Sequence, residues 1–387
     1  MSDAGVEFLG APIAYLDNAA STPLCPEAIE AMSPLHREVY ANPTGAHRMA
    51  RDTRRLIDDA RDVMAEALGS APGEIVFTGG GTEGDNLAVV GRQMQAGGVA
   101  VCSAIEHHAV LAPVERLGGR VVAVDASGVI DFDALAAALD GDATVVSVML
   151  ANNETGMVQP LEEVAEAVRA AAPQAVLHTD AVQAFAWLDV AALAACADLV
   201  SVSAHKFGGP KGVGALVVRE GVELWPLLLG GGQERGLRPG THNASGIVGM
   251  AAAAEVVLKS RAEQAVRLAG LRDRLADGVL GAVENTVETG DRSGKVAGSA
   301  HLCFEGVESE ALLFLLEDAG VYASAASSCS SGAQDPSHVL AAMGYDRALA
   351  GGALRLSLGY QTTDADVDRA LAVIPGAVAR LRDFGAG

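Results

Sequence analysis

The strongest constraint on the fold is a regular alternation of short β-branched segments with helical segments over the first two thirds of the chain. The expected strands are 74–78, 99–104, 120–124, 144–150, 175–180, 199–203 and 214–219. Helical spacing of apolar residues occurs before and between them, at 51–68, 86–94, 109–117, 133–139 and 161–171. This order predicts a mostly parallel sheet with helices on both faces, and ligands bind such sheets beyond the carboxyl ends of the strands.

The last third of the chain follows a different pattern, after a glycine-rich bend at 230–240. We expect an alanine-rich helix over 245–275, then strands at 286–289, 300–304 and 353–358 with helices at 309–319 and 364–382. The length and this change of pattern predict two domains in an α/β fold. The large α/β domain covers residues 18–258, and a smaller α+β domain combines residues 1–17 with residues 259–387.

The charge balance and the cysteines narrow the class of protein. The 387 residues hold 27 basic and 49 acidic side chains, a net charge of −22. Such a surface does not attract a nucleic-acid backbone or an anionic membrane, so we expect a small ligand or a protein partner. No secretory signal pattern is present, and we expect a soluble cytoplasmic protein. The five cysteines form no C-x-x-C pair, which argues against a disulfide framework and against a metal site.

Lys206 is the first candidate for chemistry. It follows the expected strand 199–203 and precedes Gly208, Gly209 and Pro210, which predicts a tight turn at a strand end. Only four of the 27 basic residues are lysines, so a lysine in this apolar turn needs an explanation. One interpretation is a Schiff-base lysine, because a buried amine loses its charge and becomes nucleophilic. The alternative is a solvated turn lysine.

A run of glycines at 78–86, Thr-Gly-Gly-Gly-Thr-Glu-Gly-Asp-Asn, follows a strand and opens a helix. Glycine N–H groups, the Thr82 hydroxyl and the positive end of the helix dipole together suit a phosphate group. The spacing is neither that of a Walker loop nor that of a dinucleotide fingerprint. A glycine-rich tight turn with no ligand is the alternative.

Two further side chains stand at the ends of expected strands. His107 could stack on a flat ring or move a proton, although a histidine at a strand end can also be a structural hydrogen-bond donor. Asp180 could pair with a protonated ring nitrogen, or it could cap the next helix. A phosphate site, a ring-stacking histidine, an aspartate for a ring nitrogen and a lysine for an aldehyde together describe pyridoxal 5'-phosphate.

The chain also resembles the cysteine desulfurases of the class V aminotransferase superfamily over nearly its whole length. The stretches that carry the resemblance are 15–23, 74–86, 106–107, 152–154, 180–183, 203–206, 231–241 and 354–359. The resemblance implies the fold of type I pyridoxal-phosphate enzymes and a homodimer.

It also implies a role for individual residues. Lys206 would bind the cofactor aldehyde, His107 would stack on the ring and assist proton transfer, and Asp180 would hold the pyridine nitrogen. The other implied cofactor contacts are Gln183 to the ring oxygen, Thr82, Ser203 and His205 to the phosphate, and Thr241 from the second subunit. Arg355 would bind the substrate carboxylate with two parallel hydrogen bonds, helped by Asn153 and Asn42.

Cys329 fits the cysteine that separates desulfurases from transaminating relatives. It lies in a Ser/Ala-rich segment, 323–335, with no bulky apolar residue, which predicts a mobile, exposed loop. The length of the segment resembles the long-loop branch of the family, and Ala326 and Ser328 depart from the family's Gly and Ala. Cys25, Cys102, Cys196 and Cys303 lie in turns or apolar segments and are interpreted as packing residues.

By this resemblance the enzyme would convert L-cysteine to L-alanine, with a persulfide on Cys329 that passes to a protein acceptor. Two alternatives stay open on the same scaffold, a selenocysteine lyase and an aminotransferase. A third, of another class, is a non-catalytic partner in a sulfur-transfer complex. The sequence does not distinguish iron-sulfur cluster assembly from thiolation as the destination of the sulfur.

Overall fold

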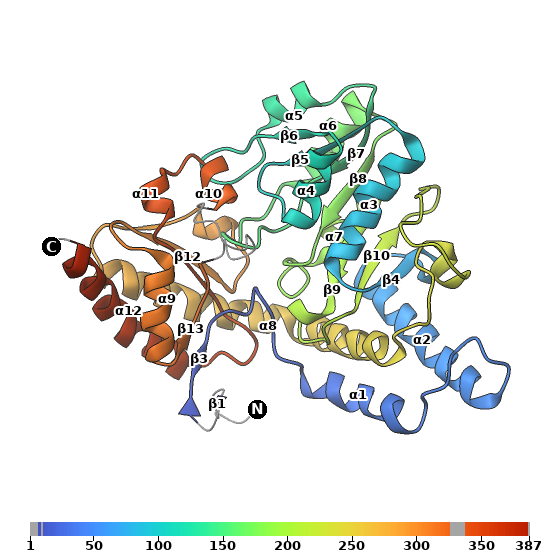
Figure 1. Cartoon of the computed structure of the whole chain (residues 1–387), viewed down its shortest axis with the longest axis horizontal. Helices are drawn as coiled ribbons and strands as arrows, with labels where there is room; N and C mark the ends of the chain where they lie inside the picture. Colours follow the sequence, from blue (N-terminus) through green and yellow to red (C-terminus); the bar gives the residue numbers. More distant parts are fainter. Residues whose placement is uncertain (1–6, 9–10, 326–336, 386–387) are drawn as a thin grey trace.

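A seven-stranded sheet forms the centre of the larger lobe of the computed structural model, which describes residues 7–8, 11–325 and 337–385 (Figure 1). Its strands are β4 (Ile75–Thr78), β5 (Val99–Ser103), β6 (Arg120–Val122), β7 (Ala143–Ser147), β8 (Val176–Asp180), β9 (Leu199–Ser203) and β10 (Gly214–Val218). They lie in the order β4-β10-β9-β8-β7-β5-β6. Only the pairs made by β10, with β4 and with β9, are antiparallel, so the predicted mostly parallel sheet is confirmed.

Both faces of this sheet are covered by helices. They are α1 (Pro26–Arg37), α2 (Arg48–Ala67), α3 (Gly81–Ala96), α4 (His108–Arg116), α5 (Phe132–Ala138), α6 (Leu161–Ala171) and α7 (Val190–Leu193). Successive strand residues point to opposite faces, so Ala215 and Val217 pack in one core while Leu216 and Val218 pack in another. The core that contains Leu216 also contains Leu87 of α3. The opposite core contains buried residues of α2 and α6.

A second, smaller lobe holds two short sheets. In the first, β12 (Ser299–Phe304) pairs antiparallel with β11 (Thr286–Glu288) and with β14 (Ala353–Ser357). In the second, β3 (Ala14–Tyr15) pairs parallel with β13 (Val321–Tyr322), which brings the start of the chain into this lobe. The helices here are α9 (Ser309–Asp318), α10 (His338–Ala342), α11 (Arg347–Ala350) and α12 (Asp364–Gly385). A short ribbon of β1 (Glu7–Phe8) with β2 (Ala11–Pro12) precedes β3.

One long helix, α8 (Ala244–Ala282), runs along both lobes (Figure 1). Its first turns, from Ile247 to Ala254, are buried in the core of the larger lobe. Its last turns, from Leu268 to Val279, are buried in a separate core with α12 and the small sheet. The division at residue 258 stays a prediction, since α8 crosses that position without a break.

Four helices extend at least three residues beyond an expected end, among them α12, which ends at residue 385 and not at 382. Helix α3 begins at Gly81, not at residue 86, because the last glycines of the run form its first turn after Gly80. Helix α2 begins at Arg48, where His47 caps it by accepting a hydrogen bond from the Ala50 N–H at 3.3 Å. The long helix continues to residue 282, beyond the expected 275. None of the helices in the described ranges is long and apolar enough to cross a membrane.

Candidate active site

The ends of β8 and β9, together with the segments that follow β5 and β7, enclose a cavity of 430 Å³ between the two lobes. Nine of the residues predicted from the sequence line it: Thr82, His107, Asn153, Asp180, Gln183, Ser203, His205, Lys206 and Arg355. These residues are separated by up to 273 positions in the sequence, from 82 to 355. The structure therefore brings most of the predicted site together at the carboxyl ends of the strands, where α/β sheets bind ligands.

Lys206 ends a short 3₁₀ turn, Ala204–Lys206, that begins directly after β9. Its amine donates hydrogen bonds to the carbonyl oxygens of Ala19, at 2.6 Å, and Ala20, at 3.0 Å. These carbonyls belong to the segment that follows β3, so the N-terminal part of the chain positions the amine. The role of Lys206 as the aldehyde-binding lysine stays a prediction.

Asp180 is the last residue of β8 and is only 4% exposed. One of its carboxylate oxygens accepts a hydrogen bond from the Val182 N–H at 2.8 Å. Burial raises the pKa of Asp180 to about 6, although that hydrogen bond and the charge of Lys206 act in the opposite direction. A protonated ring nitrogen next to this carboxylate would offset the cost of its burial.

His107 caps the N-terminus of α4, with Nδ1 accepting a hydrogen bond from the Ala109 N–H at 3.1 Å. This bond assigns the proton of the neutral ring to Nε2. Burial lowers the pKa of His107 to about 4, and the charge of Lys206 contributes. The imidazole is therefore neutral at pH 7, so it can stack on a flat ring and present its Nε2–H as a hydrogen-bond donor.

The part of the cavity that is lined by Gly81, Thr82, Ser203 and His205 is suited to a phosphate. The first turn of α3 leaves backbone N–H groups at Gly81 and Thr82 outside the helical hydrogen-bond pattern. A Cβ at Gly81 would come within 2.8 Å of a methyl group of Val182, so a larger residue here would require the turn after β8 to shift. Ser203 and His205 lie on the same side, where His205 Nδ1 is 3.4 Å from the Ser21 hydroxyl oxygen.

Arg355, on β14 of the smaller lobe, reaches the cavity from the opposite side. Its guanidinium donates to the carbonyl of Asn153 at 2.9 Å and to the carboxylate of Asp17 at 2.9 Å. The Arg355 side chain is 6% exposed, and its Nε has no hydrogen-bond partner among the described residues. A buried arginine with one orphan donor beside the cavity can bind a carboxylate in a fixed orientation.

Two predicted site residues lie outside the cavity. Asn42 is exposed, and its side-chain oxygen accepts hydrogen bonds from the N–H and hydroxyl of Thr44. Thr241 is also exposed and follows the bend at 230–240. Within one chain, neither residue lines the cavity around Lys206.

Cys329 lies outside the described residues, but both flanks of its segment are defined. On the N-terminal side, Ser324 lines the cavity and forms two backbone hydrogen bonds with Arg355. On the C-terminal side, the Ser337 hydroxyl donates to the buried carboxylate of Glu154. The ring of His338 lies 4.7 Å from that of His108, next to the cavity residue His107.

The four described cysteines are poor nucleophiles. Cys25, Cys102 and Cys303 are buried, and Cys196 is half-buried. Burial raises the pKa of all four thiols, to about 12 in the case of Cys303. Because the thiolate is the reactive form, this supports their interpretation as packing residues.

Two acidic residues that line the cavity were not predicted from the sequence, Asp17 and Asp85. Asp85 lies inside the glycine-rich stretch that we singled out for its phosphate-binding backbone, so attention to its carboxylate could have identified it. Asp17 had no comparable signal, because its partner Arg355 is 338 positions away.

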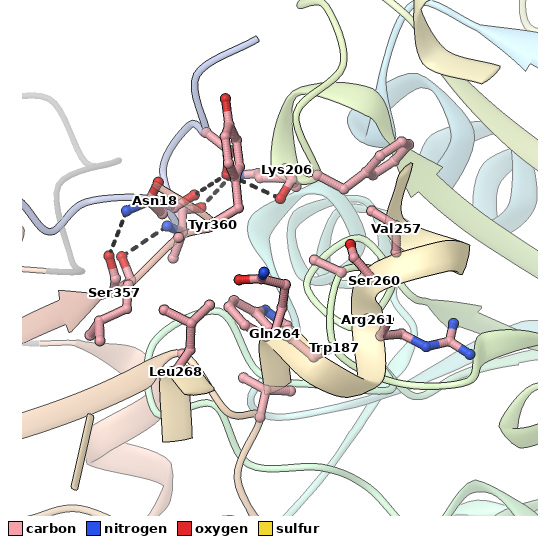
Figure 2. A pocket seen from close by; sticks show the side chains of 18 of the residues that line it. Asn18, Trp187, Lys206, Val257, Ser260, Arg261, Gln264, Leu268, Ser357 and Tyr360 are labelled. Carbon is pink, nitrogen blue, oxygen red and sulfur yellow. Dashed lines mark hydrogen bonds between the residues drawn. The ribbon is translucent and has the colours of Figure 1, made fainter. Parts of the chain in front are cut away.

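A second cavity, of 440 Å³, is also lined by Lys206 (Figure 2). It is mostly apolar, with Trp187, Val257 and Leu268 among its lining residues. Lys206 also lines it, so the lysine forms part of the wall between the two cavities.

The residues present fit pyridoxal 5'-phosphate. The cavity of 430 Å³ lies within the range of about 300 to 1,000 Å³ that small-molecule sites occupy. It joins a lysine amine, a buried carboxylate, a neutral imidazole and an open helix N-terminus that begins with Gly81. These groups match the aldehyde, the ring nitrogen, the ring face and the phosphate of the cofactor.

Comparisons with known proteins agree with this geometry. The family model for class-V aminotransferases matches residues 14–370. An IscS-like cysteine desulfurase of Mycobacterium tuberculosis is 45% identical to this chain, with coverage of 96% of this chain and 97% of that protein. A cysteine desulfurase of Gluconacetobacter diazotrophicus is 43% identical, with coverage of 96% and 94%.

Solved structures lead to the same family. A NifS-like protein superposes with a TM-score of 0.88 at 35% identity, covering 95% of this chain and all of that one. SspA in complex with cysteine superposes with a TM-score of 0.75 at 31% identity, covering 89% of this chain and 98% of that one. The chain therefore belongs to the class-V aminotransferase family of pyridoxal-phosphate enzymes, within its cysteine desulfurase branch.

Proposed function

We propose that the protein is a cysteine desulfurase that converts L-cysteine to L-alanine and passes the sulfur atom to Cys329. The observation that carries the proposal is one cavity that joins Lys206, Asp180, His107 and Arg355. The relatives named above are cysteine desulfurases, and a similar structure, that of SspA, was solved in complex with cysteine.

Each wall of the cavity then has a separate task. When bound, the cofactor supplies an aldehyde for the substrate amine and a ring that withdraws electrons from Cα. Asp180 would hold the ring nitrogen, Thr82, Ser203 and His205 would hold the phosphate, and Gln183 would contact the ring oxygen. The side-chain amide of Gln183 donates to the Ala19 carbonyl at 2.8 Å, the same carbonyl that holds the Lys206 amine.

Arg355 binds the substrate carboxylate, with Asn153 beside it. The guanidinium is already aligned by the Asn153 carbonyl and by Asp17, so the substrate meets an oriented donor. Lys206 and His107 move the protons that Cα loses and regains. Because His107 is neutral at pH 7, its ring can take up a proton at Nδ1 when that atom releases the Ala109 N–H, and the resulting imidazolium can return a proton from Nε2.

Cys329 receives the sulfur. Five residues separate it from Ser324 at the cavity, and an extended chain of five residues spans at most about 18 Å. Its thiolate forms the new S–S bond as the substrate's C–S bond breaks, and the carbon fragment takes up a proton to become alanine. The sum is L-cysteine plus thiol giving L-alanine plus persulfide, and a protein acceptor then removes the outer sulfur.

We further propose a homodimer that works in the cytoplasm. The exposed positions of Thr241 and Asn42, outside the cavity of their own chain, support a dimer in which each completes the site of the partner subunit. The apolar side chains of Leu228 and Leu229, 50% and 82% exposed, suit burial against a second copy.

The experiment that tests the proposal follows alanine formation from L-cysteine by the parent and by Cys329→Ser. We expect the parent to produce alanine and the variant to lose at least about 100-fold of that rate, because serine cannot accept sulfur. A variant that forms alanine at the parent rate would remove Cys329 from the reaction. Keto-acid formation would indicate an aminotransferase, and preference for selenocysteine would indicate a lyase for that substrate.

A further inference from the structure

Asp85 is a buried acid that the proposed reaction does not use. It lies on the first turns of α3, is 1% exposed, and lines the same cavity as Asp180 and Lys206. One of its carboxyl oxygens, Oδ1, has no hydrogen-bond partner among the described residues. Burial of a charged carboxylate oxygen without a hydrogen-bond partner costs free energy, so the protonation state of Asp85 needs an explanation.

The basic group nearest to Asp85 does not supply a compensating charge. His178 Nε2 lies 3.6 Å from the orphan oxygen, beyond hydrogen-bond distance. The two ring nitrogens of His178 already contact the hydroxyls of Ser147, at 2.8 Å, and Ser201, at 2.9 Å. Burial lowers the pKa of His178 to about 3, so the ring is neutral at pH 7.

The other charged groups around Asp85 are of like sign. Asp180 on β8 and Glu106 after β5 both raise the pKa of Asp85, after burial as the largest cause. The hydroxyl of Ser201 bonds to the Asp85 carboxyl and acts in the opposite direction. Two carboxylates that share a buried site cannot both ionise at low cost, so one of them keeps a proton.

We propose that Asp85 is a neutral positioning residue of the cofactor site, protonated beside Asp180, so that the two carboxyls carry one negative charge and that charge lies on Asp180. Asp180 has the Val182 N–H and the Lys206 amine to stabilise its charge, whereas the side chains that act on the pKa of Asp85 are Asp180, Glu106 and Ser201, none of them cationic.

The consequence concerns the ring nitrogen. Two ionised carboxylates would place more negative charge under the ring than one pyridinium can balance, and two neutral carboxyls would leave the pyridinium unpaired. A single charge on Asp180 matches one protonated ring nitrogen. This consequence rests on the proposed function, but the protonation of Asp85 can be measured without any turnover.

The test is infrared spectroscopy of the full-length, cofactor-loaded protein labelled with ¹³C at the aspartate carboxyl groups. At about pH 7 we expect the C=O band of a protonated carboxyl that shifts with the label. The label excludes Glu106, the other buried acid near the site. The band is expected to be lost in Asp85→Asn and retained in Asp62→Asn, which changes an exposed aspartate of α2. No labelled band in the parent, or a band that persists in Asp85→Asn, would overturn the proposal.

If Asp85→Asn does not fold, Asp85→Glu keeps a carboxyl at this position but takes it out of the aspartate label. A proton that resides on Asp85 then removes the labelled band, whereas a proton on Asp180 leaves the band in place and contradicts the assignment. These spectra need no cysteine, so the proposal can stand if the desulfurase reaction fails, and it can fail if the reaction stands.

Cofactor affinity gives a second readout. We expect Asp180→Asn to weaken cofactor binding at least about tenfold, because it removes the charge, and Asp85→Asn to weaken it by less than about threefold, because it replaces one neutral group with another. Equal losses in the two variants would contradict the unequal charges proposed here.

Discussion

The wall of the cavity that carries Asp180 and Lys206 differs from the wall that carries Arg355 in how the fold assembles it. Asp180 and Lys206 follow two adjacent parallel strands, with Asp180 in register with Ser201 of β9. Arg355 comes from the small sheet and is aligned by Asp17 and Asn153, which lie 338 and 202 positions away. The first wall is fixed by strand pairing within one sheet, whereas the second depends on the packing of the two lobes. Damage to the first should therefore abolish chemistry, and damage to the second should weaken binding.

The largest loss of activity is expected at the wall that carries Asp180 and Lys206, here called the sheet wall. Lys206→Ala removes the amine that we propose for aldehyde binding and proton transfer, and alanine formation should fall by at least about 1,000-fold. The matched control is Lys259→Ala, which changes an exposed lysine paired only with Glu255 on α8. A Lys206→Ala enzyme within tenfold of the parent would contradict the assignment.

A smaller loss of activity is expected at the wall that carries Arg355, here called the lobe wall. This loss should affect substrate binding more than the chemical step. Arg355→Lys keeps the charge but removes the paired donors, so kcat/KM for L-cysteine should fall about 100-fold, mainly through KM. Arg274→Lys, a change at a partly exposed position of α8 that affects ion pairs with Asp364 and Asp368, is the control. A fall in kcat with KM unchanged would show that Arg355 acts on the chemical step instead.

A third variant, Glu234→Gln, tests how the bend at 230–240 contributes to the stability of the fold. Burial alone would raise the pKa of Glu234, but hydrogen bonds from His242, Arg61 and the Phe77 N–H lower it to about 2. A lowered carboxylate pKa stabilises the fold above its ordinary value of about 4.5, and this contribution is lost as the pH falls towards 2. Glu234→Gln should therefore destabilise the protein by about 2 kcal/mol at pH 7.

The measurement is the difference in Tm between the parent and Glu234→Gln as a function of pH. We expect several degrees at pH 7 and a smaller difference as the pH falls below about 4.5. A difference that stays constant on acidification would mean that packing, not the charge of Glu234, fixes the bend.

The smallest effect is expected for Thr241→Ala, because Thr241 belongs to neither wall of the cavity. A single lost phosphate contact should lower activity about tenfold. Dimers that mix a Thr241→Ala subunit with a Lys206→Ala subunit sharpen the test. If Thr241 acts across the dimer, one of the two sites keeps both residues, and the mixed dimer should show about half of the parent activity. If it acts within its own chain, no intact site remains and activity stays at the level of the variants.

The sheet wall could be read from the sequence because its signals are local. Asp180 and Lys206 each follow a β-branched run, and parallel strands bring their carboxyl ends to one edge. The start of helix α3 was predicted less well, because glycine is a poor helix former and the first turn of α3 contains two glycines. Tertiary packing against Val182 and Ser201 overrides that preference.

The lobe wall could not be derived from local pattern. The pairing of Arg355 with Asp17 joins the two ends of the chain, and no periodicity links them. The resemblance to a family named Arg355 but not its partner, and it did not indicate that Asp85 is buried beside Asp180. The exposed positions of Asn42 and Thr241 follow from the fold of one chain; the mixed dimers test the role of Thr241, and the role of Asn42 stays a prediction.

The central claim is that sulfur moves from cysteine to Cys329. Its most direct test is intact mass analysis of the loaded protein after incubation with L-cysteine, with and without reductant, followed by peptide mapping. We predict the added mass of one sulfur atom on the peptide that contains Cys329, equal formation of alanine, and loss of the added mass on reduction. A protein that forms alanine with no added sulfur, or that carries the sulfur on another cysteine, would contradict the account.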